Sequence, residues 1–160
     1  MDLQAIMNAT AQIAGGVVLR PGVYRGAGGI AGVKIAYSLY QEQQEIADDD
    51  LVHVSFWDRT EINPPDEASG PDQNVYRHHI RMQLMLSPGR SDLPKAHGRL
   101  MPLLPLYMTA FNVNNVKLLA TCSSSRVLES PGIVEAIYPD RIALEILLIV
   151  SEKEAVSRVA

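Results

Sequence analysis

A short glycine-rich stretch, RGAGGIAG at residues 25–32, contains the spacing G-x-G-x-x-G/A in Gly26, Gly28 and Ala31. Such a turn binds the pyrophosphate of a dinucleotide when it follows a strand and opens a helix, because the first helical amides then face the phosphates. The preceding residues VVLRPGVY have strand character. Asp48, Asp49 and Asp50 lie about twenty residues further on, where an acidic side chain contacts the ribose in such folds.

The segment after the glycines has the pattern of a strand rather than a helix. Apolar and more polar residues alternate from Val33 to Leu39, and residues 40–46 are ambiguous between strand and helix. The chain also lacks the succession of strand–helix–strand units that a dinucleotide fold requires. We therefore expect residues 25–46 to form an extended arm or an insertion, and we predict no cofactor.

The histidines have no spacing typical of a metal site. None of His53, His78, His79 and His97 is in an H-x-x-x-H or H-x-H relation. His78 and His79 are adjacent on an expected strand and point to opposite faces, so we expect His78 to be partly buried and His79 to be solvated. Asp48–Asp50 lack the spaced oxygen ligands of a calcium loop. We predict no metal site.

Nucleophilic catalysis has no support in the sequence either. The chain has no G-x-S-x-G elbow. Cys122 ends an expected apolar strand and is typical of a small core residue. The SSSR stretch at 123–126 is expected to be a polar loop. We therefore predict that the protein is not an enzyme.

A basic stripe remains, formed by Arg77, His79 and Arg81 on one face of an expected strand. Either this face is simply solvated, or it contacts acidic groups of a neighbouring subunit or partner. We predict that Arg77→Glu with Arg81→Glu leaves the fold intact and weakens assembly. The acidic groups considered are Asp48–Asp50, Asp66, Glu67 and Asp72. The candidate interface residues are Arg77, His79, Arg81, Asp48, Asp49, Asp50, Arg25 and Ile30.

Composition limits the classes of protein to consider. The chain has 160 residues, of which 47% are hydrophobic, and its net charge is −4. This size and balance suit one globular domain, and the negative charge argues against a dedicated nucleic-acid binder. It is compatible with a surface that nucleic acid passes without adhering. The single cysteine excludes an intramolecular disulfide and favours a reducing compartment.

No targeting or membrane segment is expected. The first residues lack the basic region of a signal peptide. The longest apolar run, within IALEILLIV, is far too short to span a bilayer.

Hydrophobic periodicity predicts one domain, residues 1–160, of the α+β class: a mostly antiparallel sheet with two main helices on one face. Asp2 and Gly15-Gly16 are the expected limits of the first helix. Pro102 and Pro105 are expected to kink the second helix or divide it, on the side opposite an apolar stripe. The expected helices are 2–14 and 91–111. The expected strands are 17–24 interrupted at Pro21-Gly22, 33–39, 51–57, 74–86, 116–122 and a hairpin over 133–150 that turns at 138–141. The expected loops are 62–73 and 123–132, and 151–160 is expected to be a polar tail.

The order of these elements resembles the tail terminator proteins of long-tailed bacteriophages, especially the siphophage kind. The stretches that carry the resemblance are LQAIMNATAQIAG, EINPPDEA, the strand–turn–helix YRHHIRMQLMLSPGRSDLPKAHGRLMPLLPLYMTAF, and the closing VKLLATCSSSRV and GIVEAIYPDRIALEILLIV. Residues 25–46 depart from it. No motif carries a contact residue over.

The resemblance implies a structural role in a virion assembled in the host cytoplasm. Such proteins form a homohexameric ring on the head-proximal end of a finished tail tube. The ring stops tube growth and offers the surface that joins the tail to the neck. The implied partners are further copies of the chain, the tail tube protein and a head-completion or adaptor protein. DNA crosses the lumen without specific binding, and no membrane is involved.

Two alternatives remain open. The nearer one is another neck component, such as a head–tail adaptor or completion protein. The other is a small nucleotide-binding enzyme built on residues 26–31. A strand or an arm within residues 25–40 favours a neck protein, whereas a helix beginning at Gly28 favours the enzyme.

Overall fold

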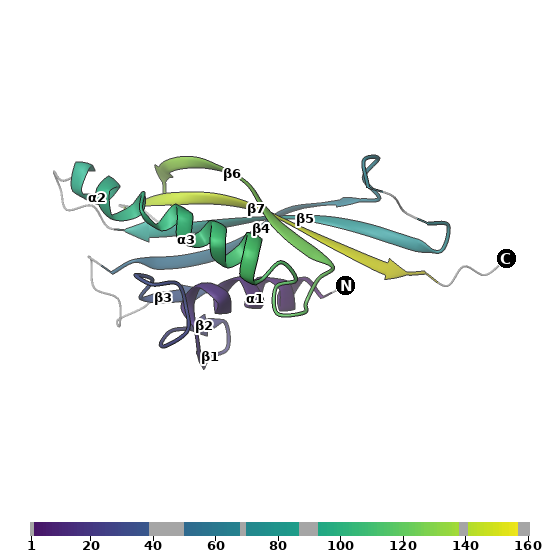
Figure 1. The fold of residues 1–160 in the computed structure, drawn as a ribbon, viewed down its shortest axis with the longest axis horizontal. Coiled ribbons are helices and arrows are strands. Elements are labelled where there is room, and N and C mark those ends of the chain that lie inside the picture. Colours follow the sequence, from purple (N-terminus) through teal and green to yellow (C-terminus); the bar gives the residue numbers. More distant parts are fainter. Residues whose placement is uncertain (1, 39–49, 68–69, 87–92, 138–140, 157–160) are drawn as a thin grey trace.

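The computed structural model describes residues 2–38, 50–67, 70–86, 93–137 and 141–156. It contains one seven-stranded sheet in the order β1-β2-β3-β4-β5-β7-β6, with the helices on one face (Figure 1). Of the strand pairs in these residues, β3–β4 is parallel and the others are antiparallel. The predicted α+β class is therefore confirmed. The elements are α1 (Leu3–Gly15), β1 (Val18–Arg20), β2 (Val23–Tyr24), β3 (Ile35–Tyr37), β4 (Val52–Ile62), β5 (Gln73–Leu86), α2 (Leu93–Leu100), α3 (Leu103–Thr109), the π-helical turn η1 (Ala110–Asn114), β6 (Ser124–Glu135) and β7 (Ile142–Ala155).

Helix α1 begins and ends where its sequence predicts. The carboxylate of Asp2 accepts a hydrogen bond from the amide of Ala5 at 3.0 Å, as an N-cap does. Gly16 ends the helix with a φ of +103°, a conformation that L side chains rarely adopt. At the last turn a Cβ on Gly15 would lie only 2.5 Å from the carbonyl oxygen of Tyr24. Glycine therefore lets α1 lie directly on β2.

Two long strands form the centre of the sheet. Strands β5 and β7 have 14 residues each and pair along their whole length. The side chains on one face of β5, including Ile80, Met82 and Leu84, pack in the hydrophobic core between the sheet and the helices, which we call the main core. Strand β7 is an interior strand of the sheet, because it lies between β5 and the edge strand β6. The prediction of a polar tail at 151–160 is wrong for residues 151–155, because they continue β7 and pair with the start of β5.

The second helix is divided, as the prolines predict. Pro102 precedes α3, and Pro105 lies in the first turn of α3, where a backbone amide has no intrahelical partner to lose. Both prolines are exposed. The predicted apolar stripe remains continuous across the break, because Leu100, Tyr107 and Phe111 have no exposed surface.

The sequence interpretation is wrong between residues 116 and 132. The expected strand 116–122 is a series of turns in which Leu118, Leu119 and Ala120 have positive φ angles of 45°, 55° and 67°. Leu118 is completely buried, so packing into the main core outweighs a conformation that is unfavourable for L residues. Residues 124–132 of the expected loop belong to the edge strand β6, whose polar sequence reflects its exposure and two register shifts.

The sheet is longer than the helices that cover it. Strands β4 and β5 and the end of β7 project past α1 and α3 at the right of Figure 1. We call the described part of residues 57–77 the hairpin end. The N-terminal lobe, residues 16–38, contains β1–β3 and the glycine-rich segment, and lies on the other side of α1 (Figure 1). Residues 39–46 of the expected arm lie outside the described residues.

Candidate functional site

The glycine-rich segment packs against the end of α1. The amide of Ile30 donates to the carbonyl of Ala14 at 2.9 Å, and Ile30 is only 9% exposed. A Cβ on Gly29 would lie 2.6 Å from the same carbonyl oxygen. Gly29 therefore permits a close backbone approach within one chain. Residues 25–38 form a packed loop and strand, so this part of 25–46 is not an extended arm, and the alternative of an insertion stays a prediction. Ile30 belongs to the core, so little of its side chain is left for a partner.

The element after the glycines is β3, not a helix. Residues 31–34 are irregular, and Ile35–Tyr37 pair with β2 and β4. The segment therefore lacks the helix N-terminus that binds a pyrophosphate in a dinucleotide fold. Of the three aspartates considered for the ribose, Asp50 is half-buried, whereas Asp48 and Asp49 lie outside the described residues.

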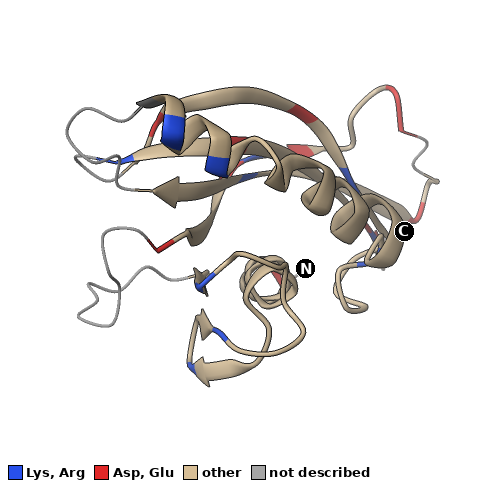
Figure 2. Ribbon diagram, turned by 60° about the vertical axis from the view of Figure 1, so that its left-hand side comes forward, with Lys and Arg blue, Asp and Glu red and all other residues tan. Residues whose placement is uncertain are grey.

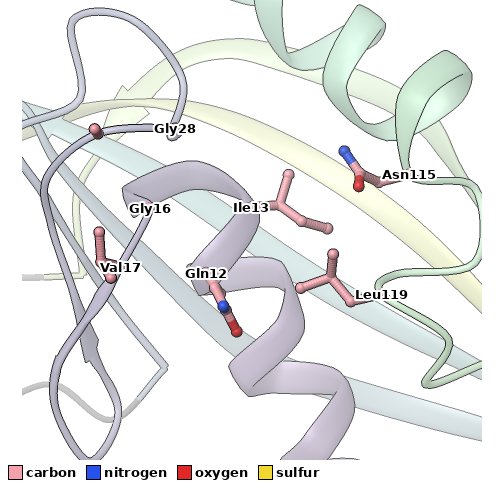
Figure 3. A pocket seen from close by; sticks show the side chains of 8 residues that line it. Gln12, Ile13, Gly16, Val17, Gly28, Asn115 and Leu119 are labelled. Carbon is pink, nitrogen blue, oxygen red and sulfur yellow. The ribbon is translucent and has the colours of Figure 1, made fainter.

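A groove separates α1 and the glycine-rich segment from η1 and the turns after it (Figure 3). It consists of two adjoining hollows, each of about 300 Å³, which share Ile13, Gly28 and Asn115. No charged side chain is among the lining residues of either hollow. The lining combines apolar groups with uncharged polar side chains, among them Gln12, Asn114 and Asn115. The groove is suited to an uncharged group.

Arg77 of the basic stripe is engaged within its own chain. Its guanidinium donates to Asp66 at 2.7 Å and to Glu61 at 3.1 Å, and Glu67 lies at 3.8 Å. The hydrogen bond that Arg77 donates to Asp66 raises the pKa of Arg77 and lowers the pKa of Asp66. His79 bonds Glu61 at 3.0 Å, which lowers the pKa of that carboxyl. The side chains of Arg77 and His79 are only 13% and 15% exposed, so the expected solvation of His79 is wrong.

Arg81 completes the stripe through a different partner. It bonds Glu145, whose side chain is 6% exposed, and its guanidinium carbon lies 5.3 Å from the centre of the Phe56 ring. Gln83 also donates to Glu145, at 3.2 Å. Of the acidic groups proposed for the stripe, Asp66 and Glu67 do bind it, but within the same chain. Because these partners would then face new negative charges, we expect the reversal of Arg77 and Arg81 to lower the stability of the fold as well as assembly.

A buried polar chain links three elements beneath the helices. His53 Nδ1 lies 2.6 Å from Tyr107 Oη, and His53 Nε2 lies 2.6 Å from Ser55 Oγ. Ser55 Oγ lies 2.8 Å from Thr10 Oγ1, which donates to the carbonyl of Met7. One assignment of protons satisfies every group: Tyr107 donates to His53, His53 to Ser55, and Ser55 to Thr10. Burial lowers the pKa of His53 to about 3 and raises that of Tyr107, so both are neutral.

Within this polar chain, Ser55 and His53 are in contact as a nucleophile and its base would be, but neither side chain is accessible to a substrate. Ser55 and His53 are within the hydrogen-bond distance that an activated serine requires. However, Ser55 is 2% exposed, and His53, Thr10 and Tyr107 have no exposed surface. A substrate cannot reach the hydroxyl, so the polar chain positions α1 and α3 on the sheet. The i, i+2 spacing of His53 and Ser55 was visible in the sequence, whereas their partners on two helices were not.

His78 belongs to a second polar chain near the hairpin end. Trp57 Nε1 donates to Thr60 at 2.9 Å, and Thr60 lies 2.8 Å from His78 Nδ1. The other ring nitrogen lies 2.7 Å from Glu152. His78 has no exposed surface, more than the partial burial expected. Within the part of the chain that the structure describes, no three His, Cys, Asp or Glu side chains form a group able to hold a metal ion.

Cys122 packs against the main core as a half-buried residue. Burial, with a smaller contribution from Glu152, raises the pKa of its thiol to about 11. A thiol with this pKa is protonated at neutral pH, so it is a weak nucleophile.

Comparison with known protein families and curated proteins assigns this chain to no family. No protein-family description matches the chain, and no curated protein matches it significantly. No helix in the described ranges is long and apolar enough to cross a membrane.

Proposed function

We propose that this protein is a structural component of a phage neck, a tail terminator that forms a homohexameric ring on a completed tail tube. The observation that carries the proposal is the element order. An N-terminal helix, a long β4–β5 hairpin, a divided helix and a closing β6–β7 hairpin follow one another on a mostly antiparallel sheet. Apart from the expected strand at 116–122, which the structure replaces with turns, this is the order on which the sequence resemblance to tail terminators rests.

The groups available for chemistry also favour a structural role over an enzymatic one. The Ser55–His53 pair is enclosed, and the groove beside the glycine-rich segment has no charged lining residue. The glycines are followed by the strand β3, and a strand at this position favours a neck protein over a nucleotide-binding enzyme. These observations support a protein that works through its surfaces.

The remaining parts of the proposal follow from the role of such a ring. Its partners are further copies of the chain, the tail tube protein and a head-completion or adaptor protein. The ring is assembled in the host cytoplasm and becomes part of the virion. The net charge of −4 supports passage of DNA through the lumen without adhesion. The related role of a head–tail adaptor or completion protein differs in binding the head side first.

The experiment that tests the proposal measures assembly and tube capping together. Native mass spectrometry and negative-stain images of the purified protein should show a six-fold ring with a central opening. Added to polymerising tail tube protein from the same genome, the chain should shorten the tubes and occupy one end of each. Tubes of unchanged length with no density at their ends would overturn the proposal. Binding to isolated heads but not to tubes would favour the adaptor role.

A further inference from the structure

The hairpin end presents an uncovered apolar surface on the helix side of the sheet. Trp57 pairs with Ile80 and Ile62 pairs with Tyr76, so the register places Trp57 and Ile62 on the face that the helices cover elsewhere. Trp57 is 50% exposed and Ile62 is 67% exposed. The bond from Trp57 to Thr60 restrains the indole ring. A restrained, half-exposed tryptophan is typical of the centre of a protein interface.

The hairpin end has a net negative charge, although Arg77 and the carboxylates bound to it lie on the opposite face of the sheet. The hairpin end contains five acidic residues, Asp58, Glu61, Asp66, Glu67 and Asp72, and two basic ones, Arg59 and Arg77. Arg77 is already bound to Glu61 and Asp66. Asp58 and Asp72 are exposed, and within the described residues neither side chain has an ion pair. Both carboxylates are therefore available to a partner.

The N-terminal lobe has the opposite character. Between residues 16 and 38 the chain contains Arg20, Arg25 and Lys34 and no acidic residue. Figure 2 shows these basic positions on the lobe, apart from the acidic positions of the hairpin end. An apolar strip lies among them, because Val17, Val18 and Leu19 are 57%, 57% and 47% exposed at β1, the edge of the sheet.

The two surfaces match each other but lie on separate parts of one molecule (Figure 1). Each has an apolar centre with charged neighbours, and the charges are opposite in sign, which is the usual arrangement of a specific interface. We propose that the hairpin end of one copy docks on the N-terminal lobe of a second copy. Because different surfaces meet, the contact is head-to-tail and repeats from copy to copy, closing into a ring when the rotation permits. This inference rests on the proposed function, since it identifies the subunit contact of the ring.

Charge reversal on each surface, followed by mixing, tests the docking. The lobe variant carries Arg25→Glu with Lys34→Glu, and the hairpin variant carries Asp58→Lys with Asp72→Lys. We expect each variant alone to self-associate about tenfold or more weakly than the wild type, because like charges then meet. An equimolar mixture should regain association, since every contact between the two variants again joins opposite charges. Native mass spectrometry and sedimentation velocity at low and high salt measure both effects.

Matched controls separate this contact from a general effect of charge. Arg99→Glu with Lys117→Glu changes the net charge as the lobe variant does, and Glu129→Lys with Glu135→Lys changes it as the hairpin variant does. All four control residues are exposed and lie outside both surfaces. These controls should associate like the wild type, and circular dichroism should show that all variants fold.

The outcomes distinguish the docking from the proposed function. Rings that withstand both reversals would overturn the docking and leave the tail terminator proposal in place. Rescue by mixing, with open filaments and no tube capping, would support the docking and overturn the tail terminator proposal. A wild type that stays monomeric at high concentration and low salt would overturn the docking, and the tube-capping assay would still test the function.

Discussion

Beneath the helices, the polar side chains of β4 are neutral and enclosed, whereas those that β4 and β5 carry beyond the helices are mostly charged and partly exposed. His53 and Ser55 represent the covered region, with Tyr107 and Thr10 as partners. Arg77 on β5 and Glu61 on β4 represent the hairpin end. The polar side chains of one pair of strands thus form hydrogen bonds between neutral groups under the helices and ion pairs beyond them. A charge in the covered region would lose its hydration, while near solvent that cost is small.

This comparison also shows where each region is vulnerable. In the covered region the side chains of the buried polar chain are hydrogen-bonded only within the protein and water cannot replace a lost partner, so a single substitution leaves groups unsatisfied. At the hairpin end Arg77 has three carboxylates around it, and solvent compensates for the loss of one. We therefore expect large losses of stability from single substitutions under the helices and small ones beyond them.

The largest effect is expected from His53→Ala. It removes a buried ring and leaves the hydroxyl groups of Tyr107 and Ser55 without their partner, so the free energy of unfolding should fall by about 4 kcal/mol. Urea unfolding followed by circular dichroism measures it. The exposed His97 is the matched control, and His97→Ala should change stability by less than about 0.5 kcal/mol. A loss below about 1 kcal/mol for His53→Ala would contradict the structural role of the polar chain.

The next effect is expected from Arg81→Glu, at the border between the two regions. Glu145 is almost enclosed and would face a second carboxylate, but Arg81 itself is 37% exposed, so solvent reduces the loss to about 2 kcal/mol. The exposed Arg59 on β4 offers a control of equal charge change. Urea unfolding should separate the two variants. Equal stabilities would show that the bond to Glu145 contributes nothing.

The pH dependence sharpens the comparison through His53→Gln. The folded-state pKa of His53 is about 3, below its ordinary value of 6.5, so its contribution is complete above pH 6.5 and is lost as pH falls from there toward 3. The wild type therefore loses stability that the variant does not. The difference between them should shrink by about 1.4 kcal/mol at pH 5.5 relative to neutral pH. A difference that stays constant between pH 7.5 and 5.5 would contradict a neutral His53.

The smallest effect is expected from Asp66→Asn at the hairpin end. The Asp66 side chain is 72% exposed, and Arg77 keeps Glu61 and Glu67 nearby, so the unfolding midpoint at pH 7 should not change measurably. The folded-state pKa of Asp66 is lowered, so any contribution is present above its ordinary pKa and disappears as pH falls through the lowered value. Thermal unfolding at pH 7 and pH 3 tests this. A loss as large as that of Arg81→Glu would remove the distinction between the regions.

Local signals in the sequence predicted the elements that depend on local interactions. The cap at Asp2 and the stop at Gly16 define α1 without reference to the rest of the fold. The period-2 pattern of β5 and the proline break before α3 are equally local. The errors fall where local pattern and packing disagree. Apolar residues 116–122 suggested a strand, yet burying Leu118 bends the backbone through left-handed turns.

The candidate site was less predictable than the fold. The sequence placed Arg77, His79 and Arg81 on one face, and the structure agrees. It did not indicate that Glu61 and Glu145, distant in sequence, would bind these groups within one chain. Pairing across neighbouring strands brought them together, and no spacing along the chain encodes that.

By itself the sequence determined the class of fold, the limits of α1, the division of the second helix and the strand that follows the glycines, because each depends on residues a few positions apart. Only the tertiary structure decided that β6 and the end of β7 are strands, since their polar residues pair with neighbours instead of forming a loop and a tail. It also decided which polar groups stay neutral and which stay charged. That choice depends on the access of water, which is set by where the helices end on the sheet.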